Sequence, residues 1–160
     1  MPNKHERTLI IIKPDAIQRN LLGEILHRFE RKGLKIIGLK MAKLTEETLN
    51  DHYGHHKDQT FFPEVKEFMK SSPVVCMALE GYNAINASRL IVGPTKGYEA
   101  EAGSIRGDFS LSTMSNIVHA SDSLEAGEIE IKRFFADDEL FDYSKIDYPY
   151  LYSSSNEKAE

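Results

Sequence analysis

A short apolar run near the start of the chain constrains its fold more than any other feature. Residues 8–12 read Thr-Leu-Ile-Ile-Ile and stop at Lys13-Pro14-Asp15. A strand in which apolar and polar residues do not alternate is buried on both faces, so this run predicts a central strand of a sheet. The run Val74–Leu79 predicts another buried strand, and further strands are expected at about residues 35–42 and 116–119.

Helical periodicity fills the segments between the predicted strands. Ile17, Leu21, Ile25 and Phe29 recur at the spacing of one helix face, and Gly33 is a natural stop. Helix N-termini are expected at Asp15 (with Gln18 as its capping-box partner), Thr45, Pro63, Asn83 and Asp122 (with Glu125).

Alternating buried strands and helices predict an α/β or α+β sandwich in which helices cover a sheet. Residues 93–107 are rich in Gly and lack periodicity, which predicts a long ordered loop. Because the chain shows no internal repeat and no linker, we expect a single domain over residues 1–160. Its core is expected at about residues 6–152 and a frayed tail at 153–160.

The charge balance narrows the possible partners. The formal net charge is -5, so bulk charge does not favour nucleic-acid binding, and a nucleotide binder must concentrate its cations locally.

No apolar stretch approaches the length of a membrane span, and residues 1–7 lack the apolar core of a secretion signal. The single cysteine, Cys76, is expected to be a buried thiol. These features predict a soluble, cytoplasmic protein without membrane attachment.

His119 is the candidate nucleophile. It ends a short apolar segment just before a predicted helix start, where backbone N–H groups favour anions. An imidazole is a good nucleophile near neutral pH because an appreciable fraction of it is uncharged. Glu130, on the following helix, can reach back to one ring nitrogen and leave the other free. From position alone, a structural histidine is the more frequent alternative.

Three cations lie at predicted element ends: Lys13, Arg89 and Arg106. Cations placed in this way can converge on a polyphosphate, and Arg can bind it in a bidentate manner. The alternative is three solvated surface charges. Neither a Walker-type loop nor the Gly-x-Gly-x-x-Gly fingerprint is present in the sequence, so ordinary P-loop and Rossmann binding are unsupported.

A histidine cluster, His52, His55 and His56, has spacing that would bind a transition metal weakly. No cysteine is near, and only Asp51 and Asp58 flank the cluster. We therefore expect a solvated turn rather than a metal site.

Several blocks of the sequence resemble the nucleoside diphosphate kinase family. Residues 116–123 (Asn-Ile-Val-His-Ala-Ser-Asp-Ser) resemble its active-site signature, Asn-x-x-His-Gly/Ala-Ser-Asp. Residues 7–15 resemble its first strand, and residues 105–109 resemble its Ile-Arg-Gly-Asp-Phe block. Phe61-Phe62, and Glu24-Ile25 with Arg28-Phe29-Glu30, fall in register as well.

The resemblance, which runs from about residue 6 to residue 152, implies a ferredoxin-like βαββαβ core. In this core, helices cover one face of a four-stranded antiparallel sheet. The resemblance also implies a ping-pong reaction. In this reaction a nucleoside triphosphate gives its γ-phosphate to His119, and the phosphohistidine then phosphorylates a nucleoside diphosphate. Mg²⁺ is the implied cofactor, held mainly by the nucleotide phosphates rather than by a protein cage. A homo-oligomer, either a hexamer or a tetramer, is implied too.

The same resemblance assigns site residues by position. The implied catalytic residues are His119, Glu130, Lys13 and Ser121. The residues implied to bind the nucleotide are Lys13, Tyr53, Phe61, Val65, Arg89, Thr95, Arg106, Thr113 and Asn116. Among these, Phe61 would stack on the base, with Val65 beside it. Stacking tolerates every base because each has a π-face, so broad nucleotide specificity is expected.

Four departures from the family pattern limit what can be carried over. Thr113 stands where an aliphatic residue is usual, and Gln59-Thr60 replaces a commoner Arg-Pro pair. Residues 93–97 lack the usual Asn-Pro after Thr95, and residues 101–103 lack a proline before the Gly. Because that loop supports subunit contacts in the family, the sequence leaves hexamer and tetramer open.

Two other functions are open to such a chain. One is a non-catalytic nucleotide-binding or regulatory module on the same fold. The other is histidine-based protein phosphorylation or nucleic-acid binding as the main role. The intact set of Lys13, His119 and Glu130 speaks against the first, and the lack of a basic balance or a partner motif speaks against the second.

Overall fold

The apolar run at residues 8–12 forms the middle of strand β1 (His5–Ile12) in the computed structural model, which describes residues 5–153. Leu9 to Ile12 are all fully buried. Strand β1 has a neighbour on each side, because it pairs with β3 (Val74–Tyr82) and with β4 (Val118–Ala120). The prediction of a central strand is therefore confirmed.

The sheet has the strand order β2-β3-β1-β4, and every neighbouring pair is antiparallel. Its outer strand β2 (Lys35–Ala42) has the bounds expected from the sequence. With the two inserted helices between β2 and β3 set aside, the chain follows the path βαββαβ, so the ferredoxin-like expectation is confirmed. The helical elements are α1 (Pro14–Gln18), α2 (Leu22–Lys32), α3 (Glu46–His52), η1 (Gly54–His56), α4 (Phe62–Lys70), α5 (Ala84–Val92), η2 (Gly97–Glu99), α6 (Ile105–Phe109), α7 (Leu124–Phe134), η3 (Asp137–Glu139) and α8 (Tyr148–Leu151).

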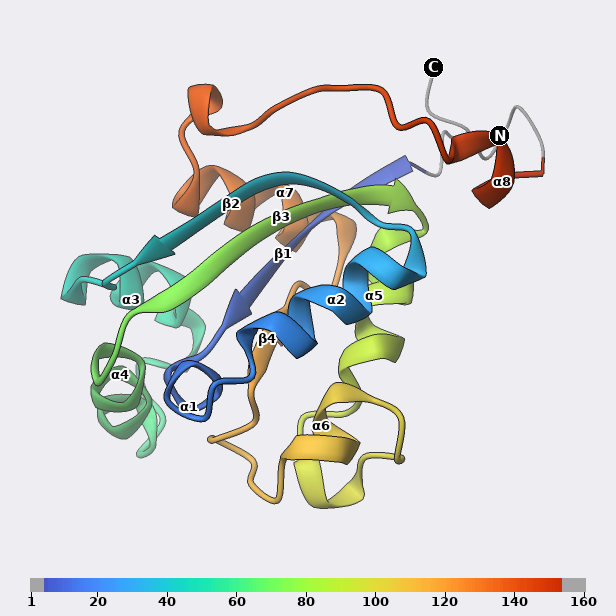
Figure 1. Ribbon diagram of the computed structural model, residues 1–160. Helices are drawn as coiled ribbons and strands as arrows, with labels where there is room; N and C mark the ends of the chain where they lie inside the picture. The colour runs from blue at the N-terminus through green and yellow to red at the C-terminus, as the bar shows by residue number, and fades with distance from the viewer. Residues whose placement is uncertain (1–4, 154–160) are drawn as a thin grey trace.

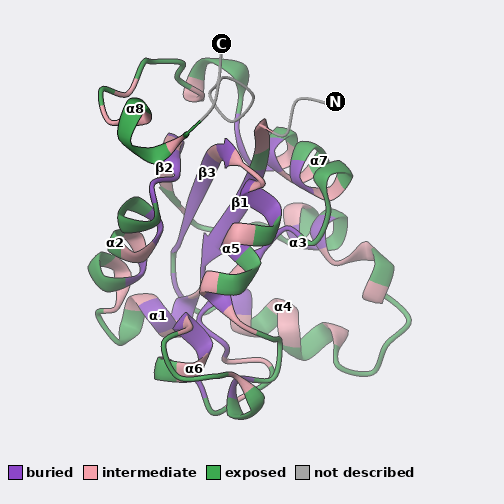
Figure 2. Cartoon of the chain, turned by 90° about the vertical axis from the view of Figure 1, so that its right-hand side faces the viewer, coloured by how far each residue is buried: buried purple, intermediate pink, exposed green. Residues whose placement is uncertain are grey.

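The core helices α2 and α5 lie on one face of the sheet, as expected, and the additional helices α3, α4 and α7 cover the other face (Figure 1). Consecutive strand residues point to opposite faces. Ile10 and Ile12 pack with α2 and α5, whereas Leu9 and Ile11 pack with α3, α4 and α7. Figure 2 shows that burial is concentrated on β1 and β3, between the two helical layers.

Two predicted helix caps are wrong, because tertiary contacts use the side chains differently. Asp15 does not cap α1; its Oδ2 accepts a hydrogen bond from the Ile117 N–H at 3.0 Å. Asp122 does not cap α7; the hydroxyl of Ser123 accepts from the Ala126 N–H at 3.1 Å. Asp122 thus stands one position before the true cap, and its side chain is exposed.

The other helix ends agree with the sequence. Thr45 caps α3 by accepting a hydrogen bond from the Thr48 N–H at 3.2 Å. Pro63 lies in the first turn of α4. Gly33 ends α2 with a φ of 99°, a left-handed conformation that favours glycine.

The predicted loop at residues 93–107 is partly wrong, since it contains η2 and the start of α6. Ser104 caps α6, its hydroxyl accepting from the Gly107 N–H at 3.0 Å. A helix of five residues is too short to produce a periodic sequence signal.

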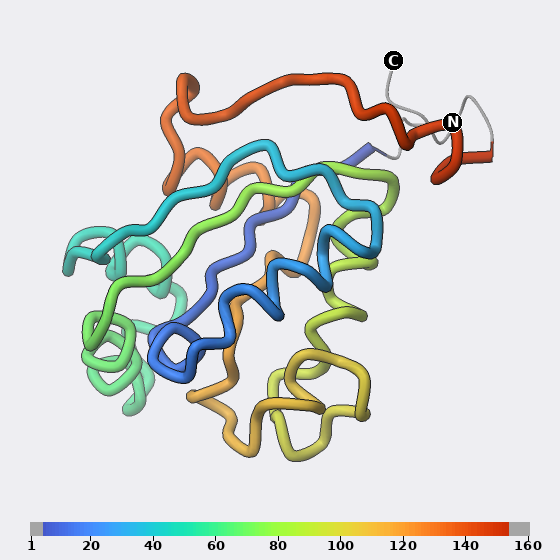
Figure 3. The backbone as a smooth tube through the Cα atoms, in the orientation of Figure 1, coloured from blue at the N-terminus to red at the C-terminus, as the bar shows by residue number. Residues whose placement is uncertain are grey.

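The segment after α7 runs back along the outer strand β2 (Figure 3). The Phe141 N–H donates to the Ile37 carbonyl at 2.7 Å, and the Tyr143 hydroxyl donates to the Ile36 carbonyl at 2.6 Å. The frayed tail expected at 153–160 lies outside the described residues apart from Ser153, and the single-domain boundaries stay a prediction. Within residues 5–153, no helix combines the length and the apolar character that crossing a bilayer requires.

Candidate active site

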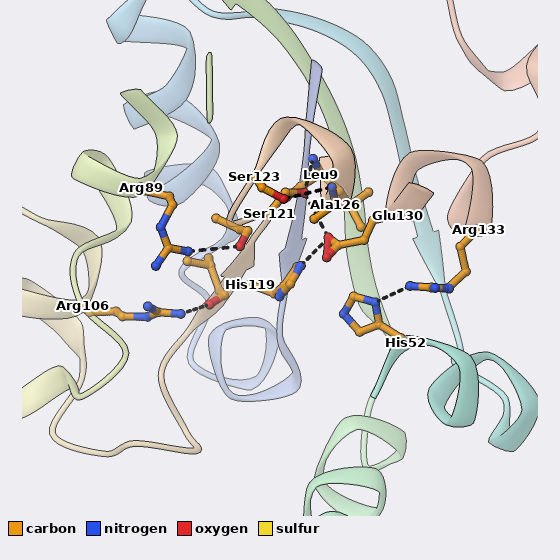
Figure 4. Close-up of polar contacts among 12 residues, drawn as sticks. Leu9, His52, Arg89, Arg106, His119, Ser121, Ser123, Ala126, Glu130 and Arg133 are labelled. Atoms are coloured by element: carbon orange, nitrogen blue, oxygen red, sulfur yellow. Dashed lines mark hydrogen bonds and ion pairs between the residues drawn. The ribbon is translucent and has the colours of Figure 1, made fainter. Parts of the chain in front are cut away.

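His119 lies on β4 with its ring toward α7, the helix that follows (Figure 4). Its Nε2 is 2.7 Å from Oε2 of Glu130, as the sequence led us to expect. The same carboxylate oxygen accepts a hydrogen bond from the Ser121 hydroxyl at 2.9 Å. One ring nitrogen of His119 is thus held by a fixed carboxylate, and the other, Nδ1, remains for chemistry.

Strand β1 fixes the turn that carries these residues. The Leu9 N–H donates to the Ser121 hydroxyl oxygen at 3.1 Å, and the Ser121 N–H donates to the Leu9 carbonyl at 3.1 Å. Helix α7 approaches β1 closely at Gly127, where an added Cβ would lie 2.5 Å from the Arg7 carbonyl oxygen. This close approach brings Glu130 within reach of His119.

Arg106 is buried and donates to three backbone carbonyls in two separate segments. Its guanidinium donates to the carbonyls of Gly93 at 3.0 Å, Asn116 at 3.0 Å and Val118 at 2.6 Å. Burial, and then the charge of Arg89, lower the pKa of Arg106 to about 10. The alternative of a solvated surface charge is therefore wrong for Arg106.

Lys13 follows directly after β1 and meets the segment that leads into β4. Its Nζ donates to Oδ1 of Asn116 at 2.7 Å, and the Asn116 amide donates in turn to the Thr95 carbonyl at 2.9 Å. Burial, and then the charge of Arg106, lower the pKa of Lys13 to about 8. Between Asn116 and β4, Ile117 has a φ of 76°, an unfavourable conformation for a β-branched residue.

A cavity of about 840 Å³ opens over these residues. It is lined by residues from distant parts of the chain, which the fold brings together. Of the predicted site residues, those that line it are Lys13, Tyr53, Phe61, Val65, Arg89, Thr95, Arg106, Thr113, Asn116, His119 and Glu130. The remaining one, Ser121, is fully buried behind His119 and contacts the cavity residue Glu130.

Phe61 lies at the mouth of the cavity, just before α4, and is 42% exposed. Val65 follows one helical turn later on the same wall. The ring of His56 lies 5.3 Å from the Phe61 ring. Burial, and then the charge of Glu130, raise the pKa of the Tyr53 hydroxyl, so it remains a hydrogen-bond donor.

The prediction that the histidine cluster is a solvated turn is wrong for His52, which is only 5% exposed. The His52 ring lies 4.7 Å from the His119 ring at an interplanar angle of 79°. Nη1 of Arg133 is 3.2 Å from Nδ1 of His52. The sequence carries no local signal for this burial, because both partners come from the other end of the chain.

A histidine paired with a carboxylate, at the wall of a cavity lined by Lys13, Arg89 and Arg106, is an arrangement that suits phosphate transfer. Comparisons with known proteins agree. The model of the family "Nucleoside diphosphate kinase" matches residues 6–140. A nucleoside diphosphate kinase of Parabacteroides distasonis is 50% identical over 149 residues, covering 93% of this chain and 97% of that protein.

Solved structures give the same result. A nucleoside diphosphate kinase of Halobacterium salinarum, in complex with CDP, aligns with a TM-score of 0.91 at 40% identity. A nucleoside diphosphate kinase family protein of Babesia bovis aligns with a TM-score of 0.89 at 44% identity. Each alignment covers 92% of this chain and 99% of the other. The chain therefore belongs to the nucleoside diphosphate kinase family, and its function is that of a nucleoside diphosphate kinase.

Proposed function

We propose that the chain carries the γ-phosphate of a nucleoside triphosphate to a nucleoside diphosphate on Nδ1 of His119. The observation that carries this proposal is the 2.7 Å contact between His119 Nε2 and Glu130, at the wall of the cavity. A carboxylate at Nε2 favours the tautomer with its hydrogen there, which leaves the Nδ1 lone pair as the nucleophile.

In the first half-reaction, the Nδ1 lone pair forms a bond to the γ-phosphorus as the bond to the β,γ-bridging oxygen breaks. The nucleoside diphosphate leaves with that electron pair. His119 gains positive charge during attack, and the carboxylate of Glu130 offsets it through the hydrogen at Nε2. In the second half-reaction, a terminal oxygen of another nucleoside diphosphate attacks the phosphohistidine, and the steps run in reverse.

The cations of the cavity would hold the phosphates. Arg106 is fixed by its three carbonyl partners, so little conformational entropy is lost when a phosphate binds. Lys13 and Asn116 present a paired ammonium and amide on the same wall, and Arg89 lies on the neighbouring helix α5. An anionic phosphate would favour the charged form of Lys13 and raise its pKa on binding.

The mouth of the cavity would hold the nucleoside. We assign base stacking to Phe61, since an exposed ring at a cavity mouth has a free face. We assign Val65 and Thr113 to the base, and Tyr53 and Thr95 to the phosphates and the ribose, since all four residues line the cavity.

Mg²⁺ fits this site as a companion of the nucleotide phosphates. Within residues 5–153, the group with metal-ligand spacing is His52, His119 and Glu130. Two imidazoles and one carboxylate do not suit an ion that prefers oxygen ligands, so no protein cage is available there. Asp122 lines the same cavity with an exposed carboxylate, and it is the residue that would approach phosphate-bound magnesium. When bound, the ion neutralises phosphate charge.

We also propose that the chain works as a cytoplasmic homo-oligomer, either a hexamer or a tetramer. Its outer strand β2 exposes Leu39 and Met41, by 50% and 60%, and outer strands of this kind are commonly covered in assemblies. The free, buried thiol of Cys76 suits a reducing compartment. Light scattering separates a hexamer from a tetramer, and a monomer would contradict the proposal.

The phosphohistidine is tested by incubating the full chain with γ-labelled ATP and quenching in alkali. We expect an alkali-stable, acid-labile label that unlabelled GDP removes as labelled GTP. His119→Ala should carry no label, whereas the matched control His27→Ala, on the exposed side of α2, should label like the wild type. Label retained in His119→Ala would assign the nucleophile elsewhere.

A further inference from the structure

His52 is a buried residue that the reaction above does not use. It ends α3, and aromatic rings surround it: Phe134 at 5.2 Å, Tyr53 at 4.7 Å and His119 at 4.7 Å. All three contacts are edge-on, with interplanar angles between 77° and 81°. His52 is therefore the side chain that packs against the flank of the His119 ring from α3.

Arg133 determines which nitrogen of His52 carries hydrogen. Figure 4 shows Arg133 reaching from α7 to Nδ1 of His52, on the side of the ring away from His119. A guanidinium has donors and no acceptor, so Nδ1 must accept this hydrogen bond at 3.2 Å. The hydrogen of His52 then lies on Nε2, and the ring is neutral.

The charge of His52 matters because Glu130 is close to both histidines. Ligand atoms of His52, His119 and Glu130 all lie within 4.8 Å of one another. A protonated His52 would bring a second positive charge to the single carboxylate that His119 contacts. It would also repel the positive charge that His119 gains when it attacks phosphorus.

We propose that His52 is a positioning residue, which holds the His119 ring against Glu130, and that Arg133 fixes the orientation and tautomer of the buried, neutral His52 ring so that Glu130 stays committed to His119. This inference rests on the proposed role of His119 as the nucleophile. Arg133 would then act on the reaction through His52, without touching the substrate.

The surroundings of His52 favour the same neutral state. Burial is the largest cause, followed by the charges of His119, Arg133, His55 and Lys13, and together they lower its pKa to about 2. The titratable and charged groups that face the His52 ring are His119 from β4, Glu130 and Arg133 from α7, His55 from η1, Lys13 from the end of β1, and the neighbouring Tyr53.

Arg133→Gln is the informative variant, because an amide can accept as well as donate and therefore allows a hydrogen on Nδ1. Arg133→Lys is the conservative variant, because its ammonium, like the guanidinium, can donate a hydrogen bond to Nδ1 but cannot accept one. Lys132→Gln removes the same charge from the adjacent, exposed position and serves as the matched control. The single-turnover phosphorylation rate of the full chain by ATP is measured between about pH 5.5 and 8.5, together with the dissociation constant of ADP.

We expect the wild type, Arg133→Lys and Lys132→Gln to share one pH profile. Arg133→Gln should be about tenfold slower throughout this pH range, because its amide no longer fixes the tautomer of His52, with unchanged ADP affinity. In a His52→Phe background, which keeps a ring but cannot be protonated, Arg133→Gln should have no further effect. A profile of Arg133→Gln that matches Lys132→Gln, or an effect that persists beside His52→Phe, would overturn the inference.

A measurement on the wild-type protein needs no variant to fold. Imidazole nitrogen NMR should show His52 with a bare Nδ1 and a protonated Nε2 over the same pH range. A doubly protonated His52 or the opposite tautomer would overturn the inference. Failure of the proposed function is distinct, because the wild-type protein would then acquire no label on His119 while the His52 spectrum stayed as expected.

Discussion

The Glu130 carboxylate contacts His119 Nε2 at 2.7 Å and accepts the Ser121 hydroxyl hydrogen at 2.9 Å with the same oxygen. This oxygen is therefore held between the His119 ring and the turn that joins β4 to α7. The arrangement links the orientation of the His119 ring to the position of α7 on the sheet.

Glu130→Gln should slow phosphorylation of the protein by ATP. The amide keeps the shape of the side chain but loses the negative charge that offsets charge on His119. A hydrogen bond to a charged group contributes about 2 kcal/mol, or about 30-fold in rate. Stopped-quench labelling measures the effect, and ADP affinity should not change. Glu128→Gln, exposed on the same helix, is the control; equal rates in the two variants would contradict the role of Glu130.

Phe61→Ala should weaken nucleotide binding without slowing transfer at saturating nucleotide. Loss of base stacking costs about 1–3 kcal/mol. Isothermal titration calorimetry with ADP and with GDP should give similar losses, since stacking does not distinguish bases. Leu90→Ala removes an exposed apolar side chain outside the cavity lining and should leave both affinities unchanged. A loss for one base only would show that Phe61 reads base edges rather than stacking.

We expect the titration of Lys13 to have opposite effects on nucleotide affinity and on the stability of the fold as pH rises. Its pKa falls from 10.5 to about 8 on folding, so the ammonium is lost as pH rises through about 8. ADP affinity should decline there, and Lys13→Arg should retain affinity to higher pH.

Because the unfolded chain holds more protons between pH 8 and 10.5, Lys13 makes the free energy of unfolding rise with pH in that window. Lys13→Met should accordingly be more stable than the wild type at pH 7 while losing nucleotide affinity, and urea unfolding measures the former. If Lys13→Met were less stable than the wild type at pH 7, burial of the Lys13 ammonium would not be costly, which would contradict this account.

Gly127→Ala should destabilise the fold, because the new Cβ would lie 2.5 Å from the Arg7 carbonyl oxygen. Overpacking of this kind costs about 1–3 kcal/mol in the free energy of unfolding. Gly23, in α2, has no neighbouring atom within 4 Å of an added Cβ, so Gly23→Ala should stabilise the protein by about 0.5–1 kcal/mol. Urea denaturation compares the two, and equal effects would show that α7 does not pack closely on β1.

The strands and most helix ends could be predicted because their signals are local. Residues 8–12 carry a strand signal in five consecutive side chains, and Gly33 and Thr45 mark helix ends by their own conformational preferences. Asp15 was misassigned because a carboxylate can cap a helix or bind a distant N–H, and the choice depends on Ile117. Nothing close to Asp15 in the sequence reports that contact.

In the candidate site, too, contacts between residues close in sequence could be predicted, and contacts that depend on the folded path of the chain could not. His119 and Glu130 lie within one strand–helix unit, so helix geometry alone suggested their contact. Arg106 was visible only as a cation near a glycine, and its burial among three carbonyls depends on the folded path of the chain. His52 stands in a polar sequence, and its burial arises from Phe134 and Arg133, which α7 brings to it.

Covalent phosphate transfer through Nδ1 of His119 is tested most directly by the position of the phosphate on the ring. The wild-type protein is phosphorylated with ATP, kept in alkali, and examined by phosphorus–proton correlation NMR after His119 is assigned with the His119→Ala variant. Because Glu130 occupies Nε2, we expect the phosphate on Nδ1 of His119 and on no other residue. A phosphate on Nε2, or on any other side chain, would contradict this mechanism.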